Sequence, residues 1–223
     1  MKLFFIRHGE PDYTTDTLTE KGKWQAECVA KRLMLTGVDE IHSSPMGRAV
    51  ESAKSLSKLT GISVTIEAWA RELGKESQTD YPDGKMTTMS LLPATYFHDQ
   101  RYRGLGLEES FDIVEGLQGS EFKSRYHSIA EGLDGLLARC GYMRNEAGFY
   151  DVVSPNDRQI VFFCHAGMQR VMLSHLFHIP YQFFAASLWP DHASITTLHF
   201  ENDELSHQIM PKLTSFGDVG HYK

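Results

Sequence analysis

Two histidines in this sequence directly follow short apolar segments. His8 and its neighbour Arg7 come after the apolar run 3–6, and His165 comes after the run 160–164. Apolar runs of this length are typical of buried strands. A neutral imidazole can attack phosphorus, and an arginine can donate two parallel hydrogen bonds to phosphate oxygens. These residue types at strand ends indicate a phosphate-binding histidine nucleophile, although a single such histidine is more often structural.

A third segment supplies another cation. The predicted strand 38–42 leads into Ser44 and Pro45, and Ser44 can cap a helix that has Pro45 as its first residue. Arg48 would then lie in the first turn, at the positive end of the helix dipole, where a cation is disfavoured. An arginine at this position is explained if an anion lies in front of it.

The order of the elements predicts how these side chains are brought together. Strands alternate with helices, which predicts a three-layer α/β/α sandwich with a mostly parallel sheet, and two late strands predict an antiparallel edge. The predicted strands are 3–6, 38–42, 62–66, 159–164, 194–200 and 204–210. In such sheets ligands bind outside the carboxyl ends of the strands. Arg7, His8, Arg48 and His165 are therefore expected to form one cationic pocket for a tetrahedral dianion.

Four motifs in this order resemble the histidine phosphatase superfamily, in the branch that includes cofactor-dependent phosphoglycerate mutases. They are Arg-His-Gly-Glu at 7–10, Ser-Ser-Pro-Met-Gly-Arg-Ala at 43–49, Arg-Glu-Leu-Gly at 71–74 and Cys-His-Ala-Gly at 164–167. The resemblance implies a phosphoglycerate mutase-like fold. It implies that His8 is the nucleophile, that Arg7, Arg48 and His165 hold the phosphoryl oxygens, and that neither a metal nor a cofactor is needed.

Glu72 is the expected proton donor for the leaving oxygen. To act as an acid near neutral pH it needs a raised pKa, from burial or from a second carboxylate. The alternative is a surface carboxylate paired with Arg71. Glu10 and Asp12 are first interpreted as loop residues, and His42 is a candidate for orienting groups around the site.

Two departures from the family pattern bear on the activity. Ala166 follows the second histidine where glycine is frequent, and Pro11 follows the first motif where true mutases have a longer Asn-rich stretch. Because the features expected of a mutase are missing, the sequence favours a metal-independent phosphatase that hydrolyses a phosphomonoester through a phosphohistidine on His8. The alternatives are a phosphoglycerate mutase and, from another class, a non-catalytic phosphate-binding protein.

The length of 223 residues suits one domain, residues 1–223, with an insertion at about 75–110. The segment 75–106 lacks a helical or strand period and is rich in turn formers and aromatic residues, which is typical of a lid or specificity loop. Lys85, Arg101 and Arg103 could grip a second anionic group of the substrate or be solvated loop charges.

The net charge of −7 argues against a nucleic acid or an anionic membrane as partner and leaves a small phosphorylated molecule. Three cysteines without metal-binding spacing fit reduced thiols in a cytoplasmic protein. We find no signal peptide and no apolar run near the ~20 residues of a membrane span. A homodimer contact through the aromatic-rich stretch 183–189 is possible, but burial in the core is the simpler interpretation.

Overall fold

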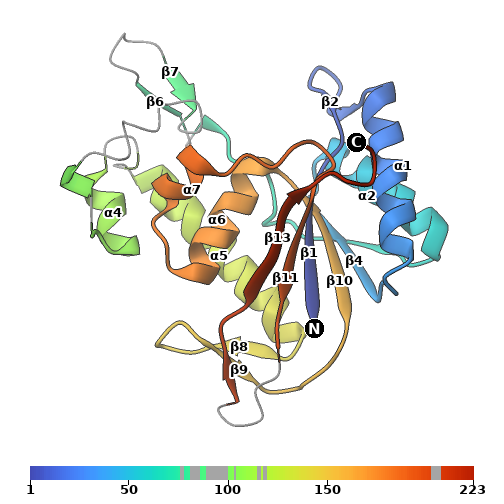
Figure 1. The fold of residues 1–223 in the computed structure, drawn as a ribbon. Coiled ribbons are helices and arrows are strands. Elements are labelled where there is room, and N and C mark those ends of the chain that lie inside the picture. Colours follow the sequence, from blue (N-terminus) through green and yellow to red (C-terminus); the bar gives the residue numbers. More distant parts are fainter. Residues whose placement is uncertain are drawn as a thin grey trace.

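The computed structural model describes residues 1–75, 78–80, 86–88, 100–102, 104–114, 117, 120–201 and 207–223. Its centre is a six-stranded sheet in the order β13-β11-β1-β10-β4-β5 (Figure 1). These strands are β1 (Lys2–Arg7), β4 (Glu40–Ser43), β5 (Val64–Ile66), β10 (Gln159–Cys164), β11 (Ile195–His199) and β13 (Lys212–Asp218). β1, β10, β4 and β5 pair in parallel, whereas β11 runs antiparallel to both of its neighbours. The predicted α/β class with a mostly parallel sheet is confirmed.

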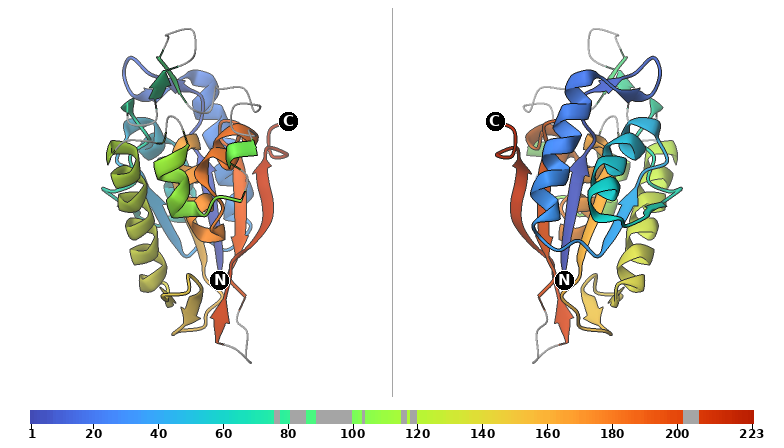
Figure 2. Two further views of the ribbon diagram at one scale, coloured as in Figure 1. Left: turned by 90° about the vertical axis from the view of Figure 1, so that its left-hand side faces the viewer. Right: turned by 90° about the vertical axis from the view of Figure 1, so that its right-hand side faces the viewer.

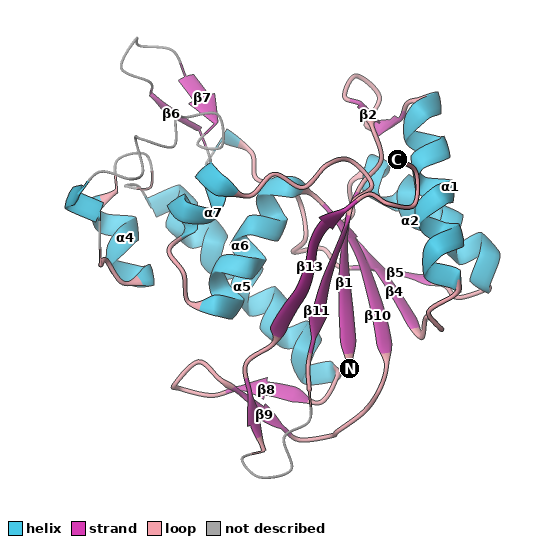
Figure 3. Ribbon diagram, in the orientation of Figure 1, coloured by secondary structure: helices cyan, strands magenta, loops and turns pink. Residues whose placement is uncertain are grey.

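Helices cover both faces of the sheet (Figures 1 and 3). α1 (Glu20–Met34) and α2 (Gly47–Thr60) lie on one face. The other face carries α4 (Leu107–Ile113), α5 (Ser120–Arg139), α6 (Ala166–Phe177) and α7 (Tyr181–Ser187). The two side views of Figure 2 show the strands running between these layers.

The alternation of side chains in β1 explains its unbroken apolar run. Successive residues of a strand point to opposite faces. Leu3 and Phe5 therefore pack in the core under α5 and α6, while Phe4 and Ile6 pack in the core under α1 and α2. A strand buried on both faces needs apolar residues at every position.

Smaller elements lie at the two ends of the sheet. β2 (Pro11–Asp12) and β3 (Thr17–Leu18) form a hairpin, as do β6 (Gln78–Asp80) and β7 (Met86–Thr88), and a 3₁₀ turn, η3, spans Gln100–Tyr102. A second sheet holds β8 (Tyr142–Arg144), β9 (Tyr150–Val152) and β12 (Gln208–Ile209).

Two expectations about the end of the chain are wrong. The last strand expected from the sequence ends at residue 210, but β13 follows it and forms the edge of the main sheet. Of the strand predicted at 204–210, only Gln208–Ile209 is a strand, and it belongs to the second sheet; residues 202–206 lie outside the described residues. β13 lies at the edge of the sheet and has no fully buried residue. Its sequence therefore shows little of the apolar pattern by which a strand is recognised.

The insertion is only partly described. Met86–Thr88 forms a strand, and residues 89–99 lie outside the described residues. Lys85, Arg103 and the side chain of Arg101 lie there as well, so the expectation that they contact the substrate stays untested. No helix in the described part of the chain is long and apolar enough to cross a membrane.

Candidate active site

The two histidines predicted from the strand ends lie next to each other. β1 and β10 pair in parallel with Arg7 opposite Cys164, so the next residues, His8 and His165, leave the sheet side by side. Their ring centroids are 5.1 Å apart, and both side chains are buried. The register of two neighbouring strands thus places both imidazoles in one pocket.

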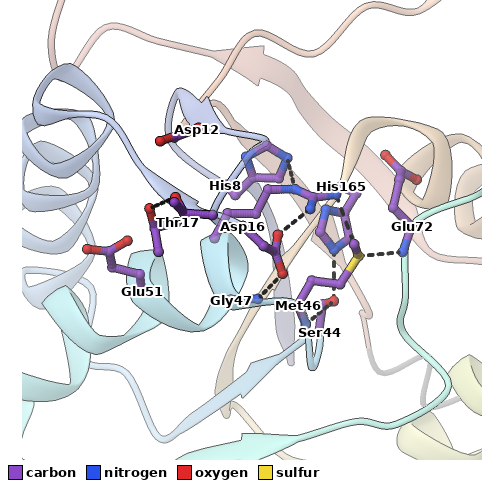
Figure 4. Close-up of polar contacts among 12 residues, drawn as sticks. His8, Asp12, Asp16, Thr17, Ser44, Met46, Gly47, Glu51, Glu72 and His165 are labelled. Atoms are coloured by element: carbon purple, nitrogen blue, oxygen red, sulfur yellow. Dashed lines mark hydrogen bonds and ion pairs between the residues drawn. The ribbon is translucent and has the colours of Figure 1, made fainter.

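Hydrogen bonds fix the tautomer of His8. Its Nδ1 lies 2.7 Å from the carbonyl oxygen of Gly9, which can only accept, so Nδ1 carries the proton. Its Nε2 accepts a hydrogen bond from Nε of Arg48 at 3.2 Å. The lone pair of His8 therefore lies on Nε2 and points into the site, toward a cation (Figure 4).

Arg7 is a buried cation that donates its hydrogen bonds to neutral acceptors. One terminal nitrogen donates to the carbonyl oxygen of Pro190 at 2.7 Å, and the other to Nε2 of His192 at 2.9 Å. Its Nε has no hydrogen-bond partner among the described atoms. A buried guanidinium that is not paired with a carboxylate favours the binding of an anion.

Arg48 enters the same pocket from the second residue of α2. Its guanidinium donates to His8, and a terminal nitrogen donates to Oδ1 of Asp16 at 2.5 Å. The predicted cap on Ser44 is wrong, because α2 begins at Gly47 after Met46, which makes no side-chain cap. Asp16 takes that role from a distant loop: its Oδ2 accepts from the Gly47 amide at 2.7 Å. Ser44 instead lies 2.8 Å, oxygen to nitrogen, from Nε2 of His165.

Glu72 reaches the site from the loop after β5. Its Oε1 accepts from the amides of Leu73 and Met168 at 2.9 Å each, and its Oε2 accepts from the amide of Gly167 at 3.1 Å. The last two amides belong to the first turn of α6, directly after His165, where the helix dipole favours a negative charge. The alternative of a surface pair with Arg71 is not what the structure shows. These three contacts favour the ionised carboxylate, and the second carboxylate expected beside an acid is not among its described hydrogen-bond partners. A carboxylate has about four acceptor positions, so one position on Oε2 is left for a proton.

Gly167 makes that approach possible. A Cβ atom at this position would lie 2.8 Å from Oε1 of Glu72. A side chain there would push the carboxylate away from the helix. The glycine of the second histidine motif is thus explained by the position of Glu72.

Burial and charge keep the site histidines neutral. Loss of hydration lowers the pKa of His8 well below its usual value, and Arg48, Arg7 and His192 lower it further, while the bond to Gly9 acts in the opposite direction. Burial also lowers the pKa of His165, with His8, Arg48 and Arg7 contributing. Burial and Arg7 lower the pKa of His192 to about 4. A neutral imidazole is the form that can act as a nucleophile.

Other candidates from the sequence lie elsewhere. His42 bonds to Glu40 and Glu67 through its two ring nitrogens, so the expectation that it orients groups of the site is wrong. Glu10 pairs with Lys21, and the carboxylate of Asp12 accepts from Thr14, as expected of loop residues. Among the described side chains, no group of three or more His, Cys, Asp or Glu is placed to hold a metal ion.

Three residues of the site were missed. Asp16 and His192 come from loops without a pattern, and Arg170 lies on α6, which is apolar on most sides. Arg170 is buried, donates to the carbonyl oxygen of Leu188 at 2.7 Å and lies 5.0 Å from the ring of Trp189. The guanidinium of Arg7 lies 5.9 Å from the same ring. No local sequence signal marks such residues, because only the fold brings these loops to the strand ends.

Beside this cluster lies a cavity of about 500 Å³. It is lined by Met46, Arg48, Arg71, Glu72, Leu73, Gly74 and Arg125. One terminal nitrogen of Arg125 donates to the carbonyl oxygens of Trp69 and Arg71, which fixes the segment that leads to Glu72. The cavity therefore adjoins both Arg48, a candidate phosphate-binding residue, and Glu72, the candidate acid.

Comparison with known proteins agrees with this geometry. Residues 3–210 match the histidine phosphatase superfamily (branch 1). The chain belongs to this superfamily. The resemblance inferred from the four motifs is confirmed, and all four lie within the matched region of this superfamily member.

Curated relatives match over different lengths. A protein of Photorhabdus laumondii named "Probable phosphoglycerate mutase GpmB" is 29% identical over 82 residues, which is 33% of this chain and 38% of that protein. The chain thus spans less than half the length of that relative. A protein of Hydrogenobacter thermophilus named "Putative phosphoserine phosphatase 2" is 24% identical over 224 residues, which is 95% of this chain and 96% of that one.

Solved structures share the fold. The structure of a phosphoserine phosphatase mutant from Entamoeba histolytica, in complex with phosphoserine, gives a TM-score of 0.66 at 19% identity and covers 100% of this chain and 99% of that one. A mycobacterial glucosyl-3-phosphoglycerate phosphatase gives 0.61 at 22% identity, with coverage of 97% and 98%. The predicted phosphoglycerate mutase-like architecture is therefore confirmed.

Proposed function

We propose that this protein is a phosphatase that hydrolyses a phosphomonoester through a phosphohistidine on His8. The tautomer of His8 carries the proposal: the proton on Nδ1 is held by Gly9, and the lone pair on Nε2 points at Arg48. Membership of the histidine phosphatase superfamily fits both activities. The likeness along nearly the whole chain to the Hydrogenobacter relative, which is named a phosphoserine phosphatase, supports hydrolysis over the mutase alternative.

The reaction would run in two steps. Nε2 of His8 attacks phosphorus, the bond from phosphorus to the leaving oxygen breaks, and Glu72 gives that oxygen its proton. Water then attacks the phosphohistidine, the P–N bond breaks, and Glu72 takes a proton from the water. Arg7, Arg48 and His165 would hold the three equatorial oxygens, where the charge of the transition state is spread.

Turnover of p-nitrophenyl phosphate and trapping of an acid-labile phosphoenzyme test this proposal. His8→Ala should abolish both and leave the circular dichroism spectrum unchanged, because the covalent step needs the imidazole. Retained turnover in the variant would overturn the role of His8. Conversion of 3-phosphoglycerate to 2-phosphoglycerate without release of phosphate would instead establish a mutase.

The substrate we propose is a small phosphomonoester whose alcohol carries a negative charge. The cavity that adjoins Arg48 and Glu72 also has Arg71 and Arg125 in its wall, which gives it an excess of positive charge in a protein of net charge −7. Phosphoserine and glucosyl-3-phosphoglycerate, which appear in the names of the relatives, both carry a carboxylate. Phosphoserine and phosphoethanolamine differ only by that carboxylate, so wild type should prefer the former in kcat/KM, and Arg71→Gln should reduce the preference. Equal rates for the two compounds would refute this choice of substrate.

A cytoplasmic location is part of the same proposal. The three cysteines, Cys28, Cys140 and Cys164, are free thiols, as expected in a reducing compartment. We propose no nucleic acid or membrane partner. A homodimer through 183–189 finds little support, since Phe184 is buried in the core and the half-exposed Trp189 lies over two arginines.

A further inference from the structure

The carboxylate of Asp16 lies against Arg48, a cation that the proposed reaction needs for the phosphoryl group. The sequence had suggested that an anion lies in front of Arg48 at the start of α2. In the structure that anion is the carboxylate of Asp16, which bonds to Arg48 at 2.5 Å and to the amide of Gly47 at 2.7 Å. The dashed lines in Figure 4 mark these contacts. The protein thus supplies its own ligand to a cation that the proposed reaction needs.

The position of Arg48 also covers the nucleophile. Its Nε lies 3.2 Å from Nε2 of His8, on the lone pair that must attack phosphorus. A phosphorus atom in line for attack has to stand about 3–3.5 Å from the same nitrogen. Arg48 must therefore leave this position when the substrate binds, and its guanidinium must exchange Asp16, at least in part, for a phosphoryl oxygen.

We propose that Asp16 competes with the phosphoryl group for Arg48. This inference rests on the proposed function, because it concerns the same pocket. At equal distance a dianion is attracted to Arg7 and Arg48 about twice as strongly as a monoanion. A phosphomonoester dianion can displace Asp16, whereas a sulfate ester or a phosphodiester offers Arg48 no more charge than Asp16 already does. The same competition weakens the binding of the product, inorganic phosphate, to this pocket.

The backbone at Asp16 allows its carboxylate to be removed cleanly. Its φ is +53°, in the left-handed region that asparagine and glycine tolerate best. Asp16→Asn keeps the shape of the side chain and removes the charge, and Asp16→Gly removes the side chain entirely. Asp12→Asn is the matched control, since Asp12 lies in the same loop and its carboxylate accepts from Thr14.

The experiment measures binding of inorganic phosphate and phenyl sulfate at pH 8, where phosphate is a dianion. Calorimetry gives the dissociation constants, and inhibition of p-nitrophenyl phosphate turnover gives Ki where the enzyme is active. Asp16→Asn and Asp16→Gly should each bind phosphate about fivefold tighter, the factor that corresponds to the upper range of a partly exposed ion pair. Phenyl sulfate should gain by no more than the same factor, because both anions lose the same competitor, and Asp12→Asn should behave as wild type.

Unchanged or weaker phosphate binding in both Asp16 variants would overturn the proposal and leave Asp16 as a residue that only positions Arg48. A protein that binds phosphate but hydrolyses no phosphomonoester would refute the proposed phosphatase activity. The competition between Asp16 and phosphate would still be tested in that case, because calorimetry measures phosphate binding without turnover.

Discussion

Acidification should destabilise this protein through its two site histidines. His8 and His165 are 2% and 0% exposed, and burial together with the nearby arginines lowers the pKa of each well below its usual value. Above pH 6.5 both are neutral whether the chain is folded or not, so they contribute no pH dependence. Below pH 6.5 the unfolded chain binds two protons that the folded protein does not, and stability falls as the pH falls.

The size of the effect follows from linkage. Each histidine that stays neutral in the folded state costs about 1.4 kcal/mol for each pH unit below 6.5. Between pH 8 and pH 5.0 the pair can therefore remove at most about 4 kcal/mol from the free energy of unfolding, the limit that is reached when both imidazoles stay neutral in the folded protein. That is a large share of the roughly 5–15 kcal/mol that a folded domain has.

Urea denaturation of wild type and of the double variant His8→Gln/His165→Gln measures this, at a series of pH values from 8 to 5. At pH 8 the difference between the two proteins reports only the lost contacts. As the pH falls, wild type should lose up to about 4 kcal/mol more than the variant, because glutamine does not titrate. Parallel curves for the two proteins over this range would refute the conclusion that both imidazoles are held neutral.

Three further outcomes are expected. A Cβ on Gly132 would lie 2.2 Å from the ring of Trp69, so Gly132→Ala should cost about 1–3 kcal/mol in urea denaturation, while Gly135→Ala in the same helix, where the nearest atom is 3.9 Å away, should cost nothing. Gly167→Ala should lower kcat roughly tenfold or more, with the protein still folded, because the new methyl group displaces Glu72; an unchanged kcat would contradict the role of that carboxylate. EDTA should leave turnover of p-nitrophenyl phosphate unchanged, and loss of activity that added metal restores would show that the chemistry was misread.

Much of the site could be predicted because its residues stand at the ends of apolar strands. Arg7, His8 and His165 each follow a segment that is buried on both faces, and such a segment is recognisable from its residues alone. Thr19 caps α1 through a similarly local contact, since its side chain accepts from the amide of Gly22 three positions on. Local signals of this kind depend only on near neighbours in the chain.

Predictions from local sequence patterns are wrong where a residue contacts a distant segment of the chain. Trp24 has the residue type of a core position in α1, but it is 48% exposed and contacts Tyr222 of the C-terminal segment, with ring centroids 5.9 Å apart. Ser44 has the residue type of a helix cap, yet it bonds to His165 while Asp16 caps α2. In each case the competing partner lies more than 30 positions away and cannot be read from the spacing.

The family, the parallel sheet and the candidate phosphate-binding cations can be recognised in the sequence alone, because buried strands and the residues that end them form a continuous local pattern. What these cations contact depends on the tertiary structure. The carboxylate in front of Arg48 is that of Asp16, and a ring nitrogen of His192 accepts from Arg7. Charge interactions act through space, so their partners depend on how the loops meet at the strand ends.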